Sequence, residues 1–139
     1  MQARPPPTHP YHPPVFEIEV QTEFCAAHAL VIAGQKEAVH GHNWRVTATL
    51  SGDSLDNDGL LCDFHHVEAS LAEIIAPFKN VDLNRTPPFT DVNPSAENVA
   101  RYIATTLQTR LKHGSPARVR SVRVTEATGC AATFYTAST

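Results

Sequence analysis

The sequence lacks the features that mark nucleic-acid-binding, membrane-spanning and disulfide-stabilised proteins. Lys and Arg number 11 against 14 Asp and Glu, the formal net charge is −3, and no basic stripe is available for nucleic acid. No apolar run approaches the roughly 20 residues of a membrane span. The three cysteines, Cys25, Cys62 and Cys130, are odd in number and far apart. This spacing favours a reducing cytoplasm over a disulfide framework.

Proline is sparse in most of the chain, because six of its 11 copies lie in residues 1–14, MQARPPPTHPYHPP. Proline fixes its own backbone angle and donates no backbone hydrogen bond, so this segment cannot form a helix or a sheet interior. We expect a disordered tail over residues 1–14, which is too polar for a signal peptide. Residues 15–139 then form one domain, long enough to bury a hydrophobic core.

Alternation of apolar and polar residues predicts strands in both halves of this domain. In one of them Trp44, Val46, Ala48 and Leu50 share a face, and polar residues share the other. Near the C-terminus, two alternating segments flank Thr128–Gly129 and predict a hairpin. The expected strands are residues 16–30, 43–52, a short one at 60–64, 117–127 and 131–137.

Apolar residues at helical spacing predict two helices between the second strand and the final hairpin. The first opens at Asp63 and continues to about Phe78. The second starts at Pro94, with Asn93 as its N-terminal cap, and ends before the turn sequence HGSP. The resulting order of elements predicts an α+β domain, in which a four-stranded antiparallel sheet carries two helices on one face.

Two histidines flank a glycine in the sequence H-G-H at residues 40–42. Side chains two residues apart in a strand point to the same side, so His40 and His42 are co-facial if the strand includes both. Should the preceding strand pair with this one, His28 faces the same point. Three imidazoles with an open fourth position are typical of catalytic zinc. A pair of surface or turn histidines fits the same spacing, so the sequence alone leaves both interpretations open.

The cysteines give no comparable pattern. Strand alternation puts Cys25 on the face opposite Phe24, Ala26 and His28. We therefore expect Cys25 to be a small buried apolar residue and not a nucleophile or ligand, and we extend this expectation to Cys62 and Cys130.

Several motifs of this sequence, in this order, resemble those of the 6-pyruvoyl tetrahydropterin synthase family, which includes the queuosine-pathway 6-carboxy-tetrahydropterin synthases. The likeness extends from Phe16 to the C-terminus. The motifs are F-x-A-A-H at 24–28, H-G-H-N-W at 40–44, D-N-D-G-L-L-C-D-F at 56–64, D-L-N at 82–84, P-S-A-E-N-V-A at 94–100 and V-T-E-A at 124–127.

This resemblance implies a fold of the tunnelling-fold type, with trimers that close into a barrel and stack in pairs as a homohexamer. It implies that the histidines of the three motifs, His28, His40 and His42, bind zinc, and that the substrate is a small pterin. It also implies that Glu126 binds the pterin ring, since a carboxylate can accept two parallel hydrogen bonds from the ring edge. Ser95 matches a position that contacts the pterin in relatives.

The sequence departs from the family at its usual catalytic cysteine, four residues before the first histidine of H-G-H, where Lys36 stands. The next residue, Glu37, gives E-x-x-H-G-H, which resembles members that use glutamate in place of cysteine. Those members are associated with trimming the side chain of dihydroneopterin triphosphate to 6-hydroxymethyl-dihydropterin. A carboxylate can carry the proton that such a retro-aldol step requires, although Glu37 and Lys36 could equally be solvated loop residues.

A second departure concerns the Asp–His pair that precedes the family's L-N motif, because Lys79–Asn80 stands there. Asp82, His65 and His66 lie nearby in the sequence, but the sequence assigns none of them as a replacement for the Asp–His pair. Three hypotheses follow: a zinc-dependent lyase with Glu37 as proton carrier, a zinc- and pterin-binding homologue with another substrate, and a non-catalytic pterin-binding or assembly protein.

Overall fold

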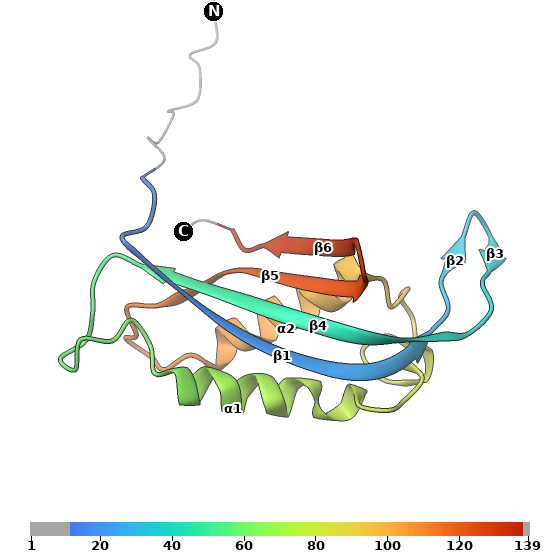
Figure 1. Cartoon of the computed structure of the whole chain (residues 1–139), viewed down its shortest axis with the longest axis horizontal. Coiled ribbons are helices and arrows are strands. Elements are labelled where there is room, and N and C mark those ends of the chain that lie inside the picture. The colour runs from blue at the N-terminus through green and yellow to red at the C-terminus, as the bar shows by residue number, and fades with distance from the viewer. Residues whose placement is uncertain (1–11, 138–139) are drawn as a thin grey trace, which may run out of the picture.

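The computed structural model describes residues 12–137, which form a four-stranded antiparallel sheet with two helices against one face (Figure 1). The strand order in the sheet is β1-β4-β5-β6, and a separate two-stranded hairpin, β2–β3, projects beyond its end. The fold class expected from the sequence is therefore confirmed. The strands are β1 Phe16–His28, β2 Val31–Ile32, β3 Gln35–Lys36, β4 His40–Gly52, β5 Arg118–Ala127 and β6 Cys130–Tyr135. The helices are α1 Phe64–Ile75 and α2 Ala96–Arg110, with short 3-10 turns at Ala76–Phe78 and Leu83–Arg85.

The hydrophobic core lies between the sheet and the two helices. Even-numbered side chains of β4, from Trp44 to Leu50, are fully buried, as the alternation predicted. Phe24 of β1 stacks on Trp44, with ring centroids 5.9 Å apart. The helices contribute the apolar residues that their spacing predicted, including Val67, Leu71, Val99, Ile103 and Leu107. The covered sheet face is thus the even-numbered face of β1 and β4.

Antiparallel pairing brings the termini of three strands to one end of the sheet. β1 ends where β4 begins, because His28 pairs with His40. β5 finishes at the same end of the sheet, because its Thr125 pairs with Arg45. We call this end of the sheet the histidine end. The opposite end, where β4 finishes, leads through a loop to the start of α1 (Figure 1).

The short strand expected at residues 60–64 is wrong, because residues 60–63 belong to the loop before α1 and Phe64 is the first residue of that helix. The Asp56 carboxylate accepts hydrogen bonds from the backbone N–H groups of Asp58 and Leu60 and so closes a turn. Leu61 is buried in the core. Asp63 caps α1, its carboxylate accepting from the backbone N–H of His65, as expected for a residue that opens this helix.

The second helix starts two residues later than the sequence predicted. Ser95 is its N-terminal cap, and the Ser95 hydroxyl accepts from the backbone N–H of Asn98 at 3.2 Å. Asn93, the expected cap, instead uses its side-chain amide on both backbone groups of Val31. Pro94 lies between them and is buried.

The expectation of buried cysteines is wrong for Cys25 and Cys130, which are exposed, whereas Cys62 is partly buried; all three are free thiols. Cys25 does lie on the odd-numbered face of β1, as the alternation predicted, but neither α1 nor α2 covers that face (Figure 1). Its Sγ donates to Oδ1 of Asn43 at 2.9 Å. Burial lowers the solvation of the Cys62 thiolate and raises the pKa of that thiol.

Within residues 12–137 neither helix has the length and apolar character needed to cross a bilayer. The tail predicted over residues 1–14 lies outside the described residues except for its last three.

Candidate metal centre

Three histidine rings meet at the histidine end of the sheet, on the face that the helices cover. The centroid of the His28 ring is 4.7 Å from that of His40 and 5.1 Å from that of His42, and the last two are 4.8 Å apart. The pairing of His28 with His40 and the inclusion of both H-G-H histidines in β4 produce this arrangement. The co-facial set expected from the sequence is therefore present.

The chain between β1 and β4 is fixed by two asparagine side chains. The amide of Asn84 bonds both backbone groups of Ala29, at 2.8 Å each, and that of Asn93 bonds both backbone groups of Val31, at 2.9 Å each. The β2–β3 turn places Ala33 at a φ of 50° and Gly34 at 77°, the left-handed region that a glycine adopts without strain. These contacts hold the residues immediately after His28.

Backbone carbonyls set the tautomers of two of the histidines. Nδ1 of His28 lies 2.8 Å from the carbonyl oxygen of Pro94, and Nδ1 of His40 lies 2.8 Å from that of Ala38. A carbonyl oxygen can only accept, so each Nδ1 carries the hydrogen and donates it. Nε2 of both rings is then the nitrogen available to bind a metal.

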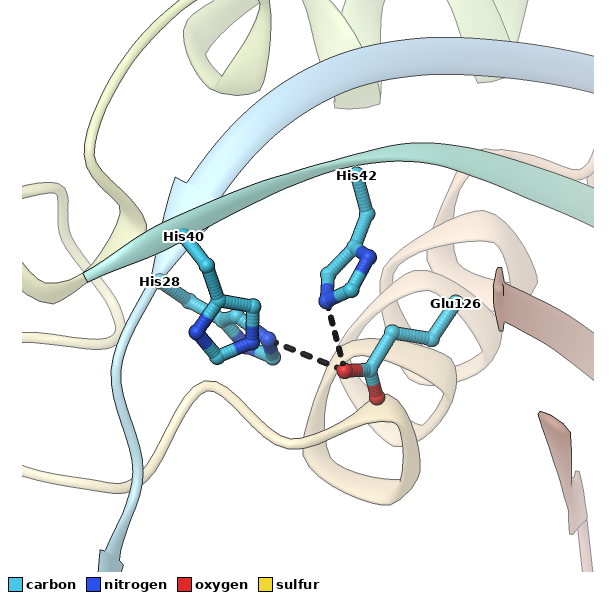
Figure 2. Close-up of side chains that lie close together, drawn as sticks. All are labelled: His28, His40, His42 and Glu126. Atoms are coloured by element: carbon cyan, nitrogen blue, oxygen red, sulfur yellow. Dashed lines mark hydrogen bonds and ion pairs between the residues drawn. The ribbon is translucent and has the colours of Figure 1, made fainter. Parts of the chain in front are cut away.

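A carboxylate completes the cluster. Oε1 of Glu126 lies 3.0 Å from Nε2 of His28 and 3.0 Å from Nε2 of His42 (Figure 2). One ligand atom from each of His28, His40, His42 and Glu126 lies within 4.8 Å of the others. The family resemblance predicts that Glu126 binds a pterin, and nothing in the sequence predicts its contact with the histidines. The contact arises from the β4–β5 pairing, in which Thr125 lies opposite Arg45 and Glu126 follows at the same strand end.

Electrostatics at the cluster require a cation or a bound proton. His28 has oxygen acceptors at both ring nitrogens, although a neutral imidazole has only one N–H to donate. Nε2 of His42 is buried and makes no hydrogen bond, although Oε1 of Glu126 lies 3.0 Å away as an ion-pair partner. Burial lowers the pKa of His42, aided by His28 and His40 and opposed by the charge on Glu126. A neutral His42 is the metal-binding form.

The donor set therefore suits a metal ion. Three imidazole nitrogens and one carboxylate oxygen are ligands that zinc takes in catalytic sites. A metal at the cluster would accept the bare Nε2 of His28, give His42 the partner that it lacks, and neutralise the Glu126 carboxylate. The cluster of three histidines and a glutamate thus indicates a metal site.

Glu37, expected to be catalytic, lies outside this cluster. It follows β3 and is half-buried; its Oε1 accepts from the backbone N–H of Leu30 at 2.8 Å, and its own N–H donates to the Leu30 carbonyl at 2.9 Å. These bonds close the base of the β2–β3 hairpin, three residues before His40. Ser95, expected to contact pterin, caps α2 next to Pro94, whose carbonyl binds His28.

The segment at Lys79–Asn80, where the resemblance predicted an Asp–His pair, runs along the outer edge of β1. The backbone N–H of Asn80 donates to the Cys25 carbonyl at 2.6 Å, and the Asp82 carboxylate accepts from the backbone N–H of Asn84. A cavity of about 650 Å³ is lined by residues of these segments, including Cys25, Asn43, Asn80 and Asp82.

The two histidines considered as substitutes for that pair are remote from the metal centre. His65 and His66 begin α1, at the end of the sheet away from the histidine end (Figure 1). Nε2 of His66 donates to the carbonyl of Arg110 at 3.0 Å, so it is engaged with the end of α2.

Comparison with known proteins places this geometry in a family. The sequence profile described as 6-pyruvoyl tetrahydropterin synthase matches residues 17–137. A provisionally named 6-carboxy-5,6,7,8-tetrahydropterin synthase of Archaeoglobus fulgidus is 33% identical over 111 residues, which cover 78% of this chain and 86% of the relative.

Solved structures have the same fold at lower sequence identity. The 6-pyruvoyl tetrahydropterin synthase of Caenorhabditis elegans superimposes with a TM-score of 0.77 at 20% identity, covering 91% of this chain and 99% of its own. The Plasmodium vivax 6-pyruvoyltetrahydropterin synthase, solved as a catalytic-residue mutant with alanine in place of glutamate, has a TM-score of 0.70 at 17% identity, with 87% and 97% covered. Given the family match over nearly the whole described chain, this protein belongs to the 6-pyruvoyl tetrahydropterin synthase family of pterin lyases.

Proposed function

We propose that the protein is a zinc-dependent lyase acting on the side chain of 7,8-dihydroneopterin triphosphate. The observation that carries the proposal is His28, which faces oxygen acceptors at both ring nitrogens while sharing one point with His40 and His42. Zinc is the metal that three neutral imidazoles with an exchangeable further position favour. When bound, zinc would act as a Lewis acid on a side-chain hydroxyl or carbonyl and acidify an adjacent proton.

Glu126 and Ser95 are proposed to hold the pterin ring. The Glu126 side chain is 23% exposed, so a ligand can reach its carboxylate, and a carboxylate pairs well with the 2-amino group and ring N–H of a pterin. The Ser95 hydroxyl uses an acceptor lone pair for Asn98, which leaves its own hydrogen free to donate to a ligand.

Glu37 is proposed as the general base and acid. It would remove the proton from the C2′ hydroxyl of the substrate side chain, after which the C1′–C2′ bond breaks and its electron pair remains on C1′, next to the pterin ring. Return of the proton to C1′ yields 6-hydroxymethyl-dihydropterin and a glycolaldehyde triphosphate, so that atoms and charge balance. The catalytic glutamate of the Plasmodium vivax relative supports a carboxylate in this role.

A diverged substrate is the second candidate, and one observation favours it. Lys79 and Asn80 stand where relatives carry an Asp–His pair, and among the described residues no other histidine approaches the metal centre. A zinc- and pterin-binding protein with another substrate, or without catalysis, would tolerate this loss.

The proposal includes a homohexamer in the cytoplasm. β1 and β6 are the outer strands of the sheet, and such edges pair readily with strands of another chain. The three free thiols suit a reducing compartment. A monomeric mass in solution at micromolar concentration would contradict the hexamer and would leave the proposed lyase reaction unaffected.

The test is turnover of 7,8-dihydroneopterin triphosphate by zinc-loaded protein, with the products identified by mass spectrometry. We expect 6-hydroxymethyl-dihydropterin ahead of 6-pyruvoyl- or 6-carboxy-tetrahydropterin. Zinc-loaded protein that binds the substrate and releases no product would overturn the lyase assignment in favour of the diverged homologue.

A further inference from the structure

One oxygen of Glu126 lies beside the point on which the histidines converge. Oε1 is 3.0 Å from Nε2 of both His28 and His42, while the second carboxylate oxygen is turned away from these rings (Figure 2). Because Nδ1 of His28 donates to Pro94, its Nε2 is a bare lone pair in the neutral ring. A carboxylate oxygen against that lone pair is repelled unless a cation or a bound proton lies with them.

The separations suit donors that share one metal ion. Ligand distances of about 2.0–2.2 Å around a tetrahedral zinc ion put neighbouring donor atoms roughly 3.3 Å apart. The two separations between Glu126 and the histidines are close to this value. Glu126 therefore stands where a fourth ligand belongs, although its proposed function is to bind the pterin ring.

The backbone at Glu126 explains how one side chain reaches this point. The β5–β6 pairing shifts register between Thr125 and Ala127, so Glu126 is the extra residue of a bulge. A bulge redirects the side chain that it carries and is frequent beside active sites. The partly exposed side chain can also turn toward solvent or a ligand.

We propose that Glu126 is the fourth metal ligand of the substrate-free protein and that a bound pterin ring removes it from the metal. Pairing with the pterin edge uses both carboxylate oxygens, whereas Oε1 is already committed at the cluster. The two uses exclude each other, so the open coordination position forms only when a pterin is present. This inference rests on the proposed function for the pterin and extends it to control of the metal site.

The consequence is a measurable antagonism between a metal and a pterin that has no side chain. Plain pterin carries the ring edge for Glu126 but no hydroxyl that can replace the carboxylate on the metal. Binding couplings are reciprocal, so plain pterin should weaken metal affinity by the same factor by which the metal weakens pterin affinity. A full substrate escapes this penalty because its side chain supplies the replacement ligand.

The experiment uses Co²⁺, whose visible absorption reports its ligands, and chelator competition to measure its affinity without turnover. Glu126→Gln should lower Co²⁺ affinity at least about tenfold, the lower bound for loss even of an outer-shell partner, and should alter the spectrum. Glu126→Asp, which keeps the charge on a shorter side chain, should behave like Glu126→Gln. Glu19→Gln removes the same charge from an exposed position on β1 and should match the parent.

Plain pterin added to the Co²⁺-loaded parent should shift the spectrum toward that of Glu126→Gln. An unchanged Co²⁺ affinity and spectrum in Glu126→Gln, or a parent spectrum unaffected by saturating pterin, would overturn the fourth-ligand proposal alone. Undiminished Co²⁺ binding in His40→Ala would instead remove the metal site and the proposed function with it.

Discussion

Two groups of histidines with a nearby carboxylate lie at opposite ends of this molecule. At the histidine end, His28, with a side chain that is 0% exposed, contacts Glu126 at 3.0 Å. At the start of α1, Nδ1 of His65 lies 3.2 Å from Oδ1 of Asp63, with side chains 91% and 56% exposed. By the distance between the histidine nitrogen and the carboxylate oxygen alone, the two groups are alike.

Their difference lies in convergence and burial. At α1, Asp63 is a helix cap: the hydrogen bond from the His65 backbone N–H lowers the pKa of this carboxyl, and water solvates the rest. At the histidine end, strands β1, β4 and β5 bring four side chains to one point, where His28 is fully buried and the other three are partly buried. A buried polar atom without a partner is costly, so the histidine end requires a cation or a bound proton, whereas the start of α1 does not.

The largest expected effect concerns Glu37, the carboxylate at the base of the β2–β3 hairpin near the histidine end. Glu37→Ala should lower turnover of dihydroneopterin triphosphate by about 10²–10⁴-fold, the usual contribution of a general acid or base, while zinc content and pterin affinity stay at parental values. Steady-state kinetics with metal analysis measures both. Glu68→Ala removes an exposed carboxylate of α1 and serves as the control. A Glu37→Ala rate equal to that of the parent would exclude Glu37 as the proton carrier.

A second prediction separates the two carboxylates of the comparison. Glu126→Gln should weaken pterin binding by about 2–4 kcal/mol, the scale for losing a charge-assisted pair in a site shielded from water. Calorimetric titration with a non-reactive pterin measures the change. Asp63→Asn should bind pterin as the parent does. Equal pterin affinities for Glu126→Gln and the parent would show that Glu126 is not the pterin anchor.

A smaller effect is expected at the cap of α2, which joins helix stability to the histidine end. Ser95→Ala should lower the free energy of unfolding by about 1 kcal/mol through loss of the hydrogen bond to the Asn98 N–H. It should also reduce pterin affinity if the hydroxyl donates to the ligand as proposed. Denaturant unfolding and pterin titration measure the two separately, and a loss of stability alone would leave Ser95 with only its capping role.

The smallest effect concerns acid stability at α1. The pKa of Asp63 is lowered in the folded chain, so its contribution to stability is present above the unfolded value near 4 and is lost as the pH falls through the lower folded value. Asp63→Asn should match the parent near pH 7 and lose less stability on acidification. Thermal unfolding between pH 7 and pH 3 measures this. Parallel losses in both proteins would show that the carboxylate charge does not stabilise the helix.

Much of the fold and the histidine set could be predicted because both depend on local periodicity. Alternation identified the core face of β4, and the spacing of His40 and His42 identified two co-facial rings. The third, His28, followed once β1 and β4 were paired as neighbours. Such pairings are short-range in sequence and carry their own pattern.

The misses depend on information that is not local. Glu126 meets the histidines through a β4–β5 pairing across some 80 residues and a bulge in β5, neither of which leaves a signal in the sequence around it. Cys25 was assigned to the correct strand face, but whether that face is covered depends on where both helices pack. Leu61 is apolar because it packs into the core from a loop. The apolar segment around it therefore has the sequence pattern of a short strand.

Zinc content tests the central claim most directly, because it asks whether the two histidine groups differ in function. The purified parent and His65→Ala should each hold about one zinc per chain after dialysis, and His40→Ala close to none, by elemental analysis. His40→Ala with the zinc content of the parent, or a parent that holds no zinc after reconstitution, would contradict the account.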